Sequence, residues 1–189
     1  ANLALADLSF TCLCEADLRG ADLSLAEVSW ADISQTALNG ASLIGANLSW
    51  SNLSSASLFR ANLSRTDLTG TDLCQTDFTQ VKVGWTRFGD VDLSQTQGLE
   101  TVAHYGPSYI DVHTIYRSQG NIPEAFLRGA GVPDAFITHA ISLGGQAIRY
   151  YSCFISYSHK DEAFARRLYA DLQQTGVRCW YAPEDIKIG

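Results

Sequence analysis

The sequence predicts a mainly β solenoid of stacked coils, followed by short helices and by the first part of an α/β unit. Three observations support this prediction. Residues 1–97 repeat every five residues, the period breaks at Gln97, and the residues after Tyr151 read as strand, helix and strand. A short fixed period is typical of stacked architectures, in which no single repeat buries its own apolar face.

The five-residue blocks, read from Ala1, carry a large apolar residue at their third position. It is Leu, Val, Ile or Phe in all nineteen blocks, and the first position is Ala, Ser or Thr except at Val81 and Val91. In a helix of about 3.6 residues per turn, residues five apart point in successively different directions and do not share one face. A straight strand would send alternate blocks to opposite faces because five is odd. The chain must therefore turn within each block, and the surrounding Gly, Ser, Asn and Asp suit turns.

Tandem A(D/N)LXX blocks of this kind resemble those of the pentapeptide-repeat family. The resemblance implies a right-handed quadrilateral β-helix over residues 1–97, with four blocks per coil and with the first and third residues of each block inside. Residues twenty apart would then stack at about the inter-strand spacing of ~4.8 Å. Columns of stacked side chains can therefore be read from the sequence.

Two of the fifth-position columns are apolar. One contains Phe10, Trp30 and Trp50, and its neighbour contains Leu5 and Leu25, with Trp85 further along the chain. The remaining fifth-position columns are polar or small: Glu15, Gln35, Ser55 and Gln75 in one, and Gly20, Gly40, Arg60 and Gln80 in the other. The family places this position outward at a corner, and a contiguous exposed apolar patch is typical of an interface. We therefore predict an interface at Leu5, Phe10, Leu25, Trp30 and Trp50; the alternative is that the stacked rings only brace adjacent coils.

The net charge of −7 belongs entirely to the repeat region. Residues 1–100 contain twelve acidic and five basic residues, whereas residues 101–189 contain eight of each. This acidic surface disfavours direct binding to nucleic acid. Some proteins of the resembled family mimic DNA and bind gyrase, and acidic columns at the second block position fit that function. Asn47 and Asn52 interrupt these columns, however, and a solvated surface that keeps the solenoid soluble explains them equally well.

The five cysteines, at positions 12, 14, 74, 153 and 179, form no C-x-x-C motif and have no histidine at ligand spacing. We expect reduced thiols in the cytoplasm and no metal site. Neither a membrane-spanning length of apolar residues nor a signal peptide is evident. The chain contains no methionine and begins and ends within a pattern, so we expect it to be a piece of a longer protein.

Residues 98–149 are predicted to form a helical cap and linker. Prolines open three short apolar-periodic runs, at Pro107, Pro123 and Pro133, and glycines follow them. Such short helices need a surface to pack on, and the open strand edges at the end of the solenoid provide one. The histidines at 104, 113 and 139 form no recognisable site.

Residues 150–189 are predicted to form a βαβ unit. YSCFISYS has the composition of a buried strand, and Ser158 begins a helix with an apolar stripe at Phe164, Leu168 and Leu172. Gly176 ends this helix, and VRCWYA forms a second strand. Strand, helix and strand with short joins make a parallel unit that needs further strands to fold.

This last segment resembles the opening third of a TIR domain, a flavodoxin-like α/β fold. Phe154 to Tyr157 match its first conserved box, and Pro183 to Gly189 loosely match the loop of its second. The resemblance implies either a homotypic signalling module or an NAD+-cleaving enzyme. The family's catalytic glutamate lies further along the fold, so we expect no catalytic residue in this chain. The cofactor-facing positions implied here are Ser156, Tyr157, Ser158, Trp180, Pro183 and Asp185.

Taken together, the sequence predicts a cytoplasmic scaffold in bacterial signalling or defence. The solenoid would mediate assembly or partner recognition for the TIR domain, with protein partners that include further copies of the chain, and without nucleic acid or membrane. One alternative is that the intact protein is a TIR NAD+ hydrolase, with NAD+ as its substrate. A second alternative is an acidic DNA mimic that binds gyrase.

Overall fold

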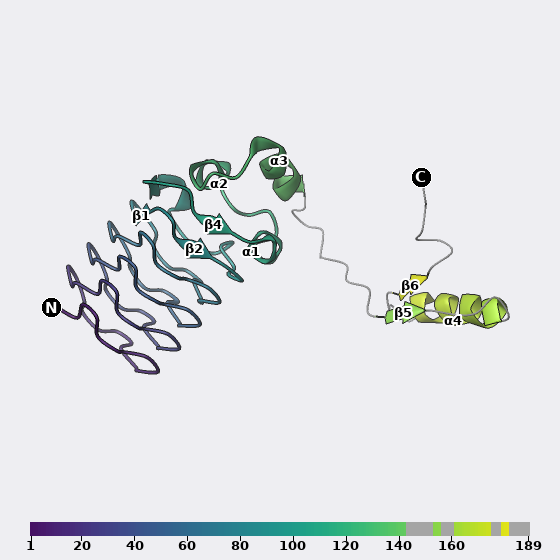
Figure 1. Ribbon diagram of the computed structural model, residues 1–189, viewed down its shortest axis with the longest axis horizontal. Coiled ribbons are helices and arrows are strands. Elements are labelled where there is room, and N and C mark those ends of the chain that lie inside the picture. The colour runs from purple at the N-terminus through teal and green to yellow at the C-terminus, as the bar shows by residue number, and fades with distance from the viewer. Residues whose placement is uncertain (143–152, 156–160, 175–178, 182–189) are drawn as a thin grey trace. The chain divides into compact units, whose positions relative to one another are not determined.

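The computed structural model describes residues 1–142, 153–155, 161–174 and 179–181 (Figure 1). The chain divides into two compact units, Ala1–Gly145 and Gln146–Gly189. Each unit is described by itself.

The first unit is a solenoid whose successive coils pair in parallel. Residues twenty apart form bridges from Asn2↔Asp22 through Asp77↔Gln97. The Leu3 N–H donates to the Asp22 carbonyl at 2.7 Å, and the Asp22 N–H donates to the Ala1 carbonyl at 3.0 Å. The predicted coil of twenty residues is therefore confirmed, and Figure 1 shows the coils stacked one after another toward α1 and α2.

Each block turns the chain by the same local device. The first N–H of a block donates to the third carbonyl of the preceding block, as in Ala6 to Leu3 at 3.1 Å. The fifth residue of every block from Leu5 to Asp90 has a positive φ, such as 62° at Leu5 and 59° at Phe10. A β-turn with a positive φ at its third residue normally favours glycine, so a bulky residue there is unusual.

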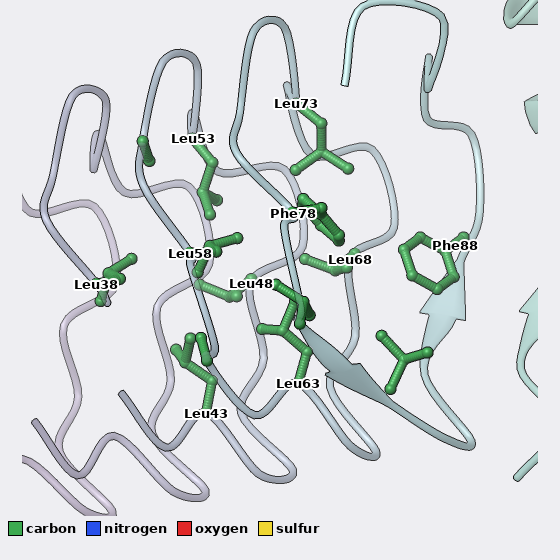
Figure 2. Close-up of a cluster of buried hydrophobic side chains, with 14 of the residues drawn as sticks. Leu38, Leu43, Leu48, Leu53, Leu58, Leu63, Leu68, Leu73, Phe78 and Phe88 are labelled. Atoms are coloured by element: carbon green, nitrogen blue, oxygen red, sulfur yellow. The ribbon is translucent and has the colours of Figure 1, made fainter. Parts of the chain in front are cut away.

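The core consists of the third residues of the blocks, with small first residues between them. From Leu23 to Leu93 the third residues are at most 2% exposed, and Figure 2 shows the labelled leucines and phenylalanines gathered inside the coils. Each buried side chain of this size stabilises the fold by about 1.5–3 kcal/mol. From Thr36 on, a threonine at the first position donates its hydroxyl to a carbonyl of the preceding coil, as in Thr66 to Leu43 at 2.7 Å.

Parallel pairing continues beyond the residue at which the period ends. Strand β1 (Lys82–Val83) pairs with β3 (Ala103–His104), and β2 (Arg87–Phe88) pairs with β4 (Tyr109–Ile110). The short 3-10 helix η1 (Leu99–Thr101) precedes β3. The predicted start of the next helix at Pro107 is therefore wrong. Tyr109 belongs to strand β4, and helix α1 covers Val112–Arg117.

Three short helices follow this last pairing: α1, α2 (Glu124–Gly129) and α3 (Asp134–Ser142). Helix α1 and its C-cap residue supply side-chain partners to the preceding coil: the Val91 and Leu93 N–H groups donate to the hydroxyls of Thr114 and Ser118 at 3.2 and 3.0 Å. Phe126 of α2 is fully buried against Phe88, with ring centroids 5.4 Å apart. The hydrophobic core of the solenoid is thus continuous with α2.

The second unit contains the strands β5 (Cys153–Ile155) and β6 (Cys179–Tyr181) and the helix α4 (Glu162–Gln174). The two strands pair in parallel, with Phe154 opposite Trp180. Of the apolar stripe predicted for α4, Phe164 and Leu168 are exposed in this chain, whereas Ala165 is buried, so the burial of the stripe stays a prediction. Helix α4 is in contact with β6.

Candidate functional site

The five residues of the predicted interface lie on the surface of the first unit, and together they are called the apolar edge: Leu5, Phe10, Leu25, Trp30 and Trp50. Their exposed fractions are 75%, 77%, 59%, 55% and 46%, in that order. All five occupy fifth block positions with φ between 59° and 62°. The apolar edge is therefore made of large side chains held outward by a left-handed backbone.

The aromatic column of the apolar edge is a continuous stack. The rings of Phe10 and Trp30 are 6.4 Å apart between centroids and tilted by 4°, and those of Trp30 and Trp50 are 5.5 Å apart and tilted by 13°. Such pairs contribute about 0.5–1.5 kcal/mol each beyond their burial. The twenty-residue coil brings these three rings together from blocks that are distant in sequence.

Glycines at the next fifth positions leave room for this arrangement. A Cβ placed on Gly45 would fall 2.8 Å from Leu25 Cδ2, and one placed on Gly70 would collide with the ring of Trp50. The side chains of Leu25 and Trp50 therefore lie over the glycine of the following coil. By contrast, a Cβ on Gly40, in a polar column, would meet no atom within 4 Å.

The backbone does not require apolar residues at these corners. Glu15, Gln35, Ser55 and Gln75 occupy fifth positions with the same positive φ, between 56° and 61°. A left-handed residue with a Cβ costs roughly 1–2 kcal/mol whatever its side chain. Stacking between the rings offsets part of this cost along the aromatic column.

The second block positions form a polar surface beside the apolar edge. Their side chains accept hydrogen bonds from the backbone two residues on, as Asp32 does from the Ser34 N–H at 3.1 Å. The side chain of Ser34, followed by its backbone N–H, lowers the pKa of Asp32, and the guanidinium of Arg19 lowers the pKa of Asp17 to about 2. These carboxylates therefore remain charged at neutral pH.

Asparagines separate the acids of this surface, as the sequence indicated. The Asn47 Nδ2 donates to Glu27 Oε2 at 2.8 Å, and the Asn52 Nδ2 donates to Asp32 Oδ1 at 3.2 Å. Each amide replaces a like charge by a hydrogen-bond donor. Within residues 1–142 the acidic columns are therefore interrupted. They do not form a continuous row of negative charge like the phosphates of a DNA strand.

The structure gives contacts for two residues that the sequence analysis named but did not assign to a site. Trp85 is 48% exposed, and the Arg65 guanidinium lies 5.8 Å from its ring centroid. His104 is packed edge-on against Phe126 at 5.2 Å, and neither ring nitrogen has a hydrogen-bond partner in the described part of the chain. Burial lowers the pKa of His104. The offset strand pairing that holds His104 beside α2 has no signature in the five-residue pattern.

The cofactor-facing positions implied for the second unit are mostly outside the described residues. This holds for Ser156, Tyr157, Ser158, Pro183 and Asp185. Trp180 lies within β6, next to the backbone of Phe154 on β5. No described helix has the length and apolar character needed to cross a membrane.

Comparison with known proteins matches both parts of the chain to families. A model of pentapeptide repeats matches in eight copies, over residues 1–40, 31–65 and 56–95, and a TIR domain model matches residues 153–189. A search of curated proteins gave no match.

Three solved structures represent the similar folds. A pentapeptide repeat protein from the thylakoid lumen of Arabidopsis thaliana is 25% identical, with 48% of this chain and 66% of that chain covered and a TM-score of 0.43. The pentapeptide repeat protein Rfr23 from the cyanobacterium Cyanothece 51142 is 36% identical, with 45% of this chain and 58% of that chain covered and a TM-score of 0.45. The plasmid-mediated fluoroquinolone resistance protein QnrB1 is 16% identical, with 62% of this chain and 81% of that chain covered and a TM-score of 0.36. The chain spans less than two thirds of the first two of these proteins.

Proposed function

Because this chain belongs to the pentapeptide-repeat family and its last residues match a TIR domain, we propose that it is an assembly scaffold for signalling. The solenoid brings copies of the chain together, and the TIR domain responds to their proximity. We place this function in bacterial signalling or defence, in the cytoplasm. The free thiols of Cys12, Cys14 and Cys74 suit such a reducing compartment.

The observation that carries this proposal is the apolar edge. Its five side chains are between 46% and 77% exposed, on a solenoid that is acidic overall and whose other two fifth-position columns are polar or small. Exposed aromatic side chains lose little conformational freedom on binding and are the residues most enriched in the energetic centres of interfaces. A second copy of the chain supplies a matching surface, because an isologous contact needs only one self-complementary patch.

The test is the association state of the chain when the edge is made polar. Trp30→Ser together with Trp50→Ser removes two of the three stacked rings and leaves the buried third positions unchanged. The matched control is Gln35→Ser with Gln75→Ser, at fifth positions of the same backbone conformation in a polar column. Sedimentation velocity over a concentration series should give self-association for the parent and the control and a monomer for the tryptophan variant. A tryptophan variant that associates like the parent would make the rings braces alone.

A second candidate function is NAD+ hydrolysis by the intact protein, which the TIR match over residues 153–189 favours. The residues proposed to face NAD+ are Ser156, Tyr157, Ser158, Trp180, Pro183 and Asp185, and no catalytic residue is proposed in this chain. NAD+ consumption by the intact protein, measured alone and after forced oligomerisation, separates the two functions. Without consumption in either condition, the TIR domain acts by association only.

Gyrase binding receives the least support of the three functions. Asn47 and Asn52 hydrogen-bond to the acids of the adjacent coil and interrupt the negative columns. A gyrase supercoiling assay at high protein concentration is the test, and inhibition there would revive this function.

A further inference from the structure

One block of the solenoid has cysteine at both its second and its fourth position. The block is Thr11-Cys12-Leu13-Cys14-Glu15. At most second positions an Asp or Asn oxygen accepts from the backbone N–H of the fourth residue of the block, as Asp7 does from Ser9 and Asn52 does from Ser54. In block 11–15 the same two positions offer only sulfur.

The repeat itself brings these two positions together. In three blocks the fourth-position hydroxyl donates to the second-position side chain: Ser49 to Asn47 at 2.7 Å, Ser64 to Asn62 at 2.8 Å, and Thr69 to Asp67 at 2.6 Å. Cys12 and Cys14 occupy the same two positions, and their sulfurs lie 2.6 Å apart. Both cysteines are exposed.

The next coil adds a carboxylate to this pair. Cys12 forms a parallel bridge with Asp32, which is twenty residues further on. The two sulfurs and a carboxylate oxygen of Asp32 all lie within 4.8 Å of one another. Asp32 Oδ1 is held by the Ser34 N–H and by Asn52 Nδ2, at 3.1 and 3.2 Å. Hydrogen bonds of this kind commonly orient a metal-binding carboxylate.

We propose that Cys12, Cys14 and Asp32 form a zinc-binding site. Zn²⁺ binds thiolate sulfur at about 2.3 Å and carboxylate oxygen at about 2.0–2.2 Å, so its ligand atoms lie roughly 3.5–3.8 Å apart in a tetrahedron. Rotation of the exposed cysteine side chains separates the sulfurs to this distance. A water molecule completes the fourth position, and the ion links the first coil to the second.

Two properties of the site select the class of metal. Thiolates favour soft or borderline ions over Mg²⁺ and Ca²⁺, and the carboxylate favours Zn²⁺ over Cu⁺. Bound zinc stabilises the coils that it joins, because the unfolded chain does not hold the ligands together. The site therefore predicts a metal-dependent stability confined to the start of the solenoid.

The test is titration of the reduced full chain with Zn²⁺ and with Co²⁺, whose thiolate charge-transfer absorption reports sulfur ligation. Cys12→Ser and Cys14→Ser should each weaken binding by more than about 100-fold, beyond the 10–100-fold typical of outer-shell partners. Asp32→Asn should weaken it less. The matched control is Cys74→Ser: Cys74 also occupies a fourth position, but its second-position neighbour is Asp72, and that variant should bind like the parent.

A second readout does not depend on the number of ions bound. Hydrogen exchange at the Leu13 and Leu18 N–H groups, which donate to the second coil, should slow on adding Zn²⁺ to the parent and not to Cys14→Ser. Equal affinity of the parent and Cys12→Ser for Co²⁺ would overturn the proposal. A reduced chain that binds neither ion, and that loses two hydrogens by joining Cys12 to Cys14 on oxidation, would overturn it in favour of a redox pair.

Discussion

Replacing Asn47 by aspartate tests whether the asparagines relieve repulsion along the acidic columns. Asn47 lies between Glu27 and Asp67 in consecutive coils, and its Nδ2 donates to Glu27 at 2.8 Å. Two unit charges about 5 Å apart in water repel by about 0.8 kcal/mol, so two neighbours give about 1.6 kcal/mol. The lost hydrogen bond adds roughly 0.5 kcal/mol at an exposed site. We expect Asn47→Asp to lower the free energy of unfolding by about 2 kcal/mol at low salt.

The assay is urea unfolding at about 0.01 M and 1 M salt, because the screening length falls from about 30 Å to about 3 Å between these conditions. Most of the loss should disappear at high salt. Asn62→Asp is the control, since Asn62 makes the same local turn but lies between Ser42 and Lys82, so a new charge there should not destabilise. Equal losses in the two variants, or a loss independent of salt, would refute the electrostatic reasoning.

Two further predictions concern the aromatic stack and the half-buried His104. Gly70→Ala should destabilise the fold more than Gly40→Ala and change the fluorescence of Trp50, because both glycines have φ near 68° but only Gly70 has a ring over it; equal effects, without a fluorescence change, would contradict the stacked arrangement. Burial lowers the folded-state pKa of His104 below the unfolded value of about 6.5, so stability should be lost as the pH falls from about 6.5 to the folded pKa and be constant above it. In His104→Leu, the urea midpoint of unfolding should no longer fall with pH over this range. An unchanged fall of the midpoint would mean that another group causes the pH dependence.

The sequence predicts the coils of this protein because every block repeats the same arrangement of buried and turning residues. The period ends once the spacing of paired strands changes from twenty residues to 21 at Lys82↔Ala103 and 22 at Arg87↔Tyr109, although the ladder continues. Each insertion of one residue shifts the pairing out of the five-residue period, so the sequence does not show which residues pair. The apolar stripe of α4 has a related limit: periodicity identifies an amphipathic face, but it does not say which strands cover that face.

For the candidate sites as well, the repeat predicts what lies within the coils, and it does not predict what depends on packing outside them. Stacking by twenties predicted the two apolar columns, and the structure places Phe10, Trp30 and Trp50 in contact as expected. The Cys12–Cys14 pair could have been predicted from the shared side of the second and fourth positions, but a search for C-x-x-C spacing does not find it. The neighbours of His104 could not be predicted, because they depend on where α2 packs.

The most direct test of the account is whether the apolar edge becomes covered when the chain associates. Side-chain footprinting with hydroxyl radicals at increasing protein concentration compares Trp50 with Trp85, which are 46% and 48% exposed and lie inside and outside the edge. We predict that labelling of Phe10, Trp30 and Trp50 falls in step with the formation of oligomers, while labelling of Trp85 does not. Oligomers that leave Trp30 and Trp50 as reactive as in the monomer would contradict the claim that this edge is the surface of assembly.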